Sequence, residues 1–68
     1  MKSISGKKFA RILEGLGWNL VRINGSHHIY MKQGSTARIS LPIHGTDDLK
    51  IGLLRHFMKV AGITEKEL

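Results

Sequence analysis

The sequence contains no cysteine, which excludes disulfide bonds, thiolate metal sites and cysteine nucleophiles. This absence fits a reducing compartment. No apolar run approaches the roughly 20 residues that a membrane-spanning helix needs. The basic, amphipathic start "MKSISGKKFARILEGLG" also lacks the unbroken apolar segment of a secretory signal. We therefore expect a soluble, cytoplasmic protein that does not associate with membranes.

Acidic residues are scarce: five Asp and Glu stand against 11 Lys and Arg, a formal net charge of +6. So large an excess on 68 residues predicts attraction to polyanions. Nucleic acid is the commonest partner of this kind, because phosphate neutralisation alone gives dissociation constants of roughly 10⁻⁴ to 10⁻⁶ M. Two alternatives are that the charge serves solubility, or that it matches an acidic protein.

The length predicts a single domain over residues 1–68. A chain of this size buries only about 60% of the surface that it exposes when unfolded. A deep cofactor cavity would remove most of the core, so we expect a shallow surface site and no cofactor.

An amphipathic helix is predicted over residues 6–15, with Ser5 as its N-cap. Its apolar residues recur at the helical spacing i, i+3, i+4 and i+7 and form one stripe; they are Phe9, Ile12, Leu13 and Leu16. Gly15 or Gly17 is expected in the left-handed conformation that follows a helix. Off the stripe lie Lys7, Lys8 and Arg11, which form either a solvated helix face or a phosphate-contacting edge.

Three strands are predicted next, at residues 18–24, 27–31 and 36–43, separated by turns at Asn24-Gly25 and around Gly34. A second helix is expected within residues 49–63, capped by Thr46 or Asp47 and stopped by Gly62. Residues 64–67 have capping-box spacing, which predicts a short final helix. The expected fold is α+β, in the order α-β-β-β-α, with both helices on one face of a three-stranded antiparallel sheet.

A turn centred on Gly34 would pair residues whose numbers sum to 68, so that Tyr30 faces Arg38 and His28 faces Ser40. This register predicts that the helices cover Ile29, Met31, Ala37, Ile39 and Leu41. It leaves on the open face His28, Tyr30, Lys32, Thr36, Arg38 and Ser40. An imidazole among cations suits RNA cleavage, in which a base removes the proton of a ribose 2′-hydroxyl. Such a surface also suits RNA binding without catalysis.

A metal site is not expected. The adjacent residues His27 and His28 point to opposite faces of a strand and cannot share an ion. A site that joins His28 to His44 or His56 would lack a carboxylate ligand at a useful position.

The segments "SGKKFARILEGLGWNLVRINGSHHIY", "LPIHG" and "LKIGLLRHFMKVAGI" follow one another in this order, and the chain resembles the HicA toxin family over about residues 5–63. The resemblance implies a fold like that of double-stranded-RNA-binding domains. It also implies a metal-independent endoribonuclease that acts on mRNA (an mRNA interferase) and is held inactive by a HicB antitoxin. The family's Gly-Ser-His motif falls on Gly25 and Ser26 and points to His27 as the catalytic residue. In some members the next position, here His28, takes this role.

Two departures from the family pattern concern the substrate. Asn24 stands where members often carry a base, and "TDDLKIG" opens the second helix with acids in place of a lysine cluster. We therefore expect contact with single-stranded RNA more than shape recognition of a duplex. The residues expected to contact RNA are Lys7, Lys8, Arg11, Gly25, Ser26, Tyr30, Arg38 and Lys50. A non-catalytic RNA-binding module and a protein-interaction module remain alternatives.

Overall fold

The computed structural model describes residues 3–68. Three strands form one antiparallel sheet in the order β1-β2-β3. The elements are α1 (Gly6–Gly15), β1 (Trp18–Asn24), β2 (His27–Lys32), β3 (Arg38–Pro42), α2 (Ile51–Ala61) and the short 3₁₀ helix η1 (Glu65–Glu67). The predicted α+β class and the order α-β-β-β-α are confirmed. Within the described residues, no helix has the length and apolarity that a membrane span requires.

The ends of the helices follow local sequence signals. Ser5 Oγ accepts a hydrogen bond of 3.1 Å from the backbone N–H of Lys8 and so caps α1. Gly17 (φ 94°) and Gly62 (φ 69°) take the left-handed conformation just after α1 and α2. Thr64 forms a capping box at the start of η1. Each of these features was predicted, because each depends on residues only a few positions apart.

The predicted cap of α2 at Thr46 or Asp47 is wrong. The helix begins later, with Lys50 at the N-cap and no side-chain capping bond. The segment just before α2 is instead paired with the N-terminal segment: the Leu49 backbone N–H donates to the carbonyl oxygen of Ile4 at 2.8 Å. This pairing holds the chain extended up to the residue where the helix starts.

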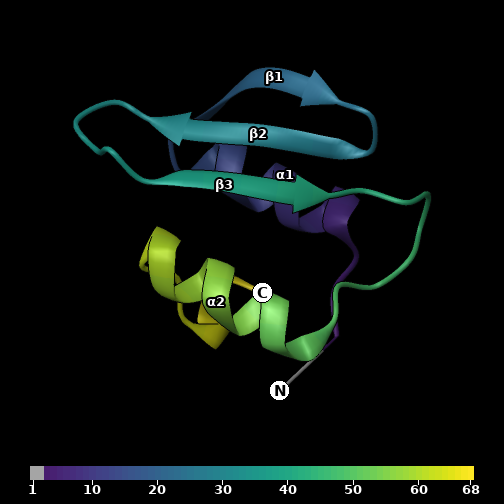
Figure 1. Ribbon diagram of the computed structural model, residues 1–68. Helices are drawn as coiled ribbons and strands as arrows, with labels where there is room; N and C mark the ends of the chain where they lie inside the picture. The colour runs from purple at the N-terminus through teal and green to yellow at the C-terminus, as the bar shows by residue number, and fades with distance from the viewer. Residues whose placement is uncertain (1–2) are drawn as a thin grey trace.

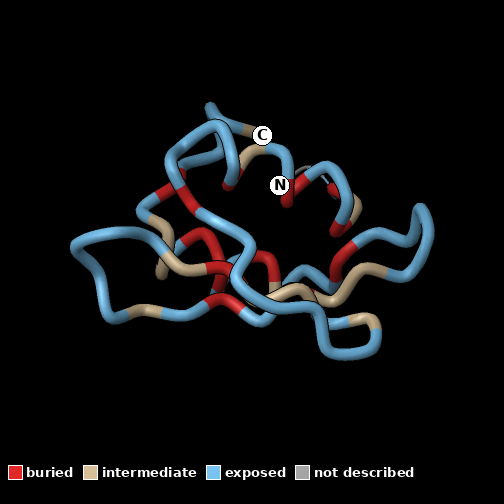
Figure 2. The backbone as a smooth tube through the Cα atoms, turned by 90° about the horizontal axis from the view of Figure 1, so that it is seen from above, coloured by how far each residue is buried: buried red, intermediate tan, exposed pale blue. Residues whose placement is uncertain are grey.

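One core lies between the sheet and the two helices. Figure 1 shows α1 behind the sheet and α2 beside it, next to β3. Figure 2 shows the buried stretches gathered toward the centre and the exposed loops at the periphery. The rings of Phe9 and Phe57 stack across the helix pair with centroids 6.1 Å apart. The fully buried side chains are Tyr30, Phe9, Leu13, Ile39, Leu41 and Leu54.

The register of β2 against β3 differs from the prediction by one residue. Tyr30 pairs with Ile39 and His28 with Leu41, so the numbers of paired residues sum to 69. Ile39 and Leu41 are buried, as predicted, whereas every side chain of β2 lies on the face opposite to the one predicted. Tyr30 is 2% exposed, and the prediction that it lies on the open face is wrong.

The connection between the strands explains the shift. The Ser35 backbone N–H donates to the Lys32 carbonyl oxygen at 3.1 Å, with Gly34 at φ 84°, and the chain then runs two further residues before β3 begins. The axis of the hairpin therefore falls after Gly34 and not on it, which inverts the faces of one strand. Burial of Tyr30 is accommodated because its hydroxyl donates a 2.7 Å hydrogen bond to Glu14 Oε2 on α1.

Candidate functional site

The face of the sheet turned away from the helices carries the polar residues of the three strands. Side chains alternate along each strand, and cross-strand partners share a face. Since Tyr30, Ile39 and Leu41 point into the core, the residues between them point outward. We call this set the open face; it consists of Asn19, Arg22, Asn24, His27, Ile29, Met31, Arg38 and Ser40.

His27 is the histidine of the open face. It begins β2, is exposed, and lies between Asn24 on β1 and Pro42 on β3. Its Nδ1 lies 3.2 Å from Ser40 Oγ, a hydrogen bond in which the tautomer decides which group donates. Because Ser40 occupies Nδ1, the other ring nitrogen, Nε2, is left for a ligand.

The tight turn before His27 fixes where β2 starts. Gly25 takes a positive φ of 62°, which L side chains rarely adopt. The Ser26 carbonyl oxygen accepts a 2.9 Å hydrogen bond from the Ile43 backbone N–H. This bond ties the β1–β2 turn to the end of β3, so the Gly-Ser-His segment is held at one end of the sheet.

His28 lies on the other face. It pairs with Ile23 and Leu41 and is half-buried on the helix side, so the prediction that it is the exposed histidine is wrong. Tyr30 faces the same way. Burial, assisted by the hydrogen bond to Glu14 and by the negative charge of that group, raises the pKa of Tyr30 to about 12. Its hydroxyl is therefore protonated and bonded to α1, and the Tyr30 side chain lies buried on the face opposite to His27.

Two arginines give the open face its charge. Arg22 on β1 and Arg38 on β3 line a hollow of about 380 Å³ together with Val21, Asn24 and Ile29. No strand contains an acidic residue: all five lie in α1, in the loop before α2 or in η1. The open face is therefore cationic with no carboxylate among its residues.

Arg38 and Ser40 were predicted on this face, Ser40 without a role in a site, whereas Arg22 was not identified at all. β1 carries an irregularity between Leu20 and Arg22, where the register changes. Such a bulge shifts the alternation of a strand. The sequence "WNLVRIN" alone therefore does not reveal on which face Arg22 lies.

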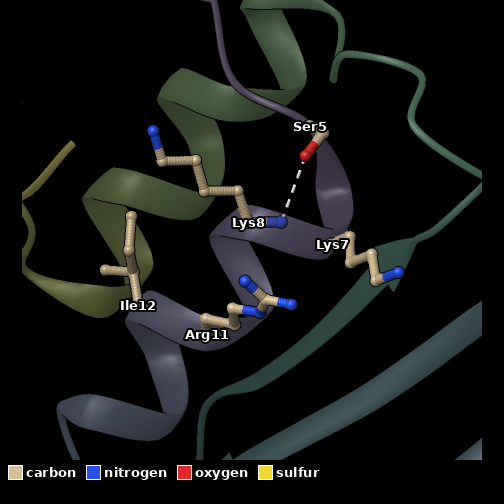
Figure 3. Close-up of a pocket in the computed structure, with 5 residues that line it drawn as sticks. All are labelled: Ser5, Lys7, Lys8, Arg11 and Ile12. Carbon is tan, nitrogen blue, oxygen red and sulfur yellow. Dashed lines mark hydrogen bonds between the residues drawn. The ribbon is translucent and has the colours of Figure 1, made fainter.

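The predicted RNA contacts on α1 form a separate cluster. Lys7, Lys8 and Arg11 are exposed and line a hollow of about 450 Å³ with Ser5 and Ile12 (Figure 3). They belong to the helix that covers the other face of the sheet, so the structure does not place them with His27.

The other residues predicted to contact RNA lie partly beside His27 and partly on the helix side of the molecule. Gly25 and Ser26 adjoin His27 in the chain, whereas Lys50 is exposed at the start of α2. His56 lies on α2, its ring centroid 5.9 Å from that of Phe57. Among the described residues, no three of the His, Asp and Glu side chains gather closely enough to hold a metal ion.

Comparison with known proteins agrees with the motifs. A search of curated proteins found no match to the chain. The family model of the HicA toxin of bacterial toxin–antitoxin systems matches residues 6–63, which span every element from α1 to α2. The match includes the Gly-Ser-His segment and all of the open face. The chain therefore belongs to the HicA toxin family.

Proposed function

We propose that this toxin is a metal-independent endoribonuclease that cleaves mRNA, with His27 as its general base. The observation that carries the proposal is the position of His27: an exposed imidazole on a cationic face without carboxylates, with Nδ1 engaged by Ser40. Membership of the toxin family supports the toxin role, and the chemistry is argued from the residues themselves.

The reaction needs a proton acceptor and positive charge. His27 takes the proton of a ribose 2′-hydroxyl at Nε2, and the 2′-oxygen attacks the adjacent phosphorus. The bond between phosphorus and the 5′-oxygen then breaks, the leaving oxygen takes a proton from a water molecule, and the hydroxide left behind takes back the proton held by His27. The products are a 2′,3′-cyclic phosphate and a free 5′-hydroxyl. Positive charge beside the phosphate stabilises the charge that develops on its oxygens.

Ser40 supports the required tautomer. When His27 Nδ1–H donates to Ser40 Oγ, Nε2 carries the lone pair and accepts the ribose proton. General-base assistance of this kind accelerates a reaction about 10² to 10⁴-fold. A slow enzyme of this type is sufficient for a toxin, because one cut inactivates a long mRNA.

The open face also indicates which substrate binds and how an inhibitor would act. A shallow surface with half-buried Ile29 and Met31 between two arginines fits unpaired nucleotides, whose bases and phosphates are both exposed. A HicB-like antitoxin would inhibit the toxin by covering His27 and the arginines. Acidic residues on the antitoxin would complement this face.

The test is an RNA cleavage assay on the purified toxin, its His27→Ala and His28→Ala variants, and His56→Ala as an exposed control. Each is assayed with and without a chelator, and circular dichroism checks that each variant is folded. We expect His27→Ala to lose at least about 100-fold in cleavage rate. We expect His56→Ala to cleave like the parent, and the chelator to have no effect.

The other outcomes are distinct. Loss of cleavage in folded His28→Ala with an active His27→Ala would contradict the assignment of the base. Inhibition by the chelator would contradict the metal-independent mechanism. RNA that stays intact with the parent, yet binds it in a salt-dependent way, would favour the non-catalytic RNA-binding module.

A further inference from the structure

The hollow between Arg22 and Arg38 is a feature that the cleavage step itself does not use. It spans the open face from β1 to β3, and its lining combines two guanidinium groups, the amide of Asn24 and the apolar side chain of Ile29. Same-face neighbours on a strand lie about 6.6 Å apart, so Ile29 is one such step from His27 along β2. The hollow is thus next to the proposed base.

We propose that this hollow is a subsite for one unpaired nucleotide of the substrate RNA, the neighbour of the nucleotide whose 2′-hydroxyl His27 deprotonates. This inference rests on the proposed function. Arg22 and Arg38 hold the phosphates of that nucleotide, its base lies on Ile29, and Asn24 forms hydrogen bonds with an edge of the base.

The charges of the hollow fit phosphate. Arg22 and Arg38 come from the two outer strands and converge on one space, and none of the strands supplies a carboxylate to neutralise them. A guanidinium presents planar pairs of N–H donors that match phosphate oxygens. Two guanidinium groups that line one hollow with half-buried Ile29 fit a nucleic-acid backbone better than a solvated strand edge.

The floor fits a base. Ile29 is half-buried and lies between Arg22 and Ser40 in the register, so its exposed part forms an apolar patch with polar residues on both sides. An unstacked base buries its face on such a patch. Asn24, the cross-strand partner of His27, offers both a donor and an acceptor to the base edge and is the residue that sets base preference at this position.

The experiment measures binding apart from cleavage. The probe is a fluorescent single-stranded RNA with every 2′-oxygen methylated, which lacks the nucleophile and stays intact. Its affinity for Arg22→Ala and Arg38→Ala is compared with that for Arg55→Ala, which removes the same charge from the exposed surface of α2. Titrations run at several salt concentrations.

We expect Arg22→Ala and Arg38→Ala each to weaken binding about five- to tenfold and to reduce the salt slope by about 1. The control Arg55→Ala should change affinity less than about twofold. On a cleavable RNA library, Asn24→Ala should broaden the base found beside the cut. In NMR, the Ile29 methyl signals should shift on adding the probe, while those of Ile51, an exposed isoleucine on α2, stay in place.

Equal affinity of the Arg22→Ala, Arg38→Ala and Arg55→Ala variants would overturn the subsite. The proposal would also be overturned if Arg22→Ala and Arg38→Ala weakened binding of the antitoxin but not of the probe RNA. The hollow would then be a protein interface. The probe has no 2′-hydroxyl for a base to act on, so its affinity reports the subsite and not the proton transfer. A failure of His27 as the base would therefore appear only in the cleavage assay, and a failure of the subsite only in binding.

Discussion

Replacing Tyr30 by phenylalanine tests the register that places His27 on the open face. Tyr30 and His27 lie on opposite faces of β2, so burial of one fixes the exposure of the other. In the structure the Tyr30 side chain is buried, and its hydroxyl donates to Glu14 Oε2 at 2.7 Å. In the register expected from the sequence, in which Tyr30 pairs with Arg38, the Tyr30 hydroxyl would be solvated. Tyr30→Phe would then have almost no effect on the free energy of unfolding.

The magnitude follows from the hydrogen bond and from the pKa. A hydrogen bond to a charged group contributes about 1.5 to 3 kcal/mol. Because Glu14 is exposed, we expect Tyr30→Phe to lower the free energy of unfolding by about 1 to 2 kcal/mol at pH 8.

The pKa of Tyr30 rises from 10.0 to about 12 on folding, so its contribution is complete below pH 10 and is lost as the pH rises through 12. At pH 11 the parent should have lost about 1.4 kcal/mol through this group. The phenylalanine variant has no such loss, and the two proteins should then be almost equally stable.

Urea unfolding of both proteins at pH 8 and pH 11 measures this difference. Tyr30 is the only tyrosine, so the absorbance of tyrosinate reports its ionisation directly. Glu14→Gln should keep the pKa of Tyr30 raised, because burial is the largest cause of the shift. A tyrosine that titrates near pH 10 in the folded parent, or a stability gap independent of pH, would refute the register.

Two further predictions concern the supports of the site. Ser40→Ala should lower the cleavage rate about two- to tenfold with unchanged affinity for uncleavable RNA, and shift the His27 tautomer in ¹⁵N NMR; Ser40→Thr should restore the rate. Gly6→Ala should destabilise the fold by about 1 to 3 kcal/mol in urea unfolding, because a Cβ there meets the carbonyl oxygen of Pro42. Gly52→Ala, in open space on α2, should be neutral or up to about 1 kcal/mol stabilising.

Local signals in the sequence were sufficient for the element order and for most helix ends. Ser5 caps α1 and Gly62 ends α2 because a side-chain oxygen or a glycine acts within one helical turn, whatever the rest of the chain does. The start of α2 was mispredicted because it depends on a distant segment. The backbone bond from Leu49 to Ile4 links parts of the chain that lie far apart in sequence.

The residues of the candidate site could be predicted only in part. Which side chains share a face depends on the β2–β3 connection and on a bulge within β1. The extra residues after Gly34 invert the faces of β2, and the bulge before Arg22 decides where that arginine lies. Neither leaves a clear signal in the sequence pattern. The family motif indicated His27, whereas the alternation argument favoured His28, which the structure places on the helix side. A sequence motif assigns a residue directly, whereas the alternation of side chains assigns a face only if the register of the hairpin is correct.

Packing of the core determines that His27 points outward, and the interactions of its own imidazole contribute little. Its single side-chain bond, 3.2 Å to an exposed serine, contributes too little to hold the strand in register. Slipping β2 by one residue would turn His27 inward, but it would also expose Tyr30 and break its bond to Glu14. Removing so large a side chain from the core costs several kcal/mol, far more than the imidazole gains in either position. The buried tyrosine therefore sets the face of the sheet on which His27 lies, although the two side chains point in opposite directions.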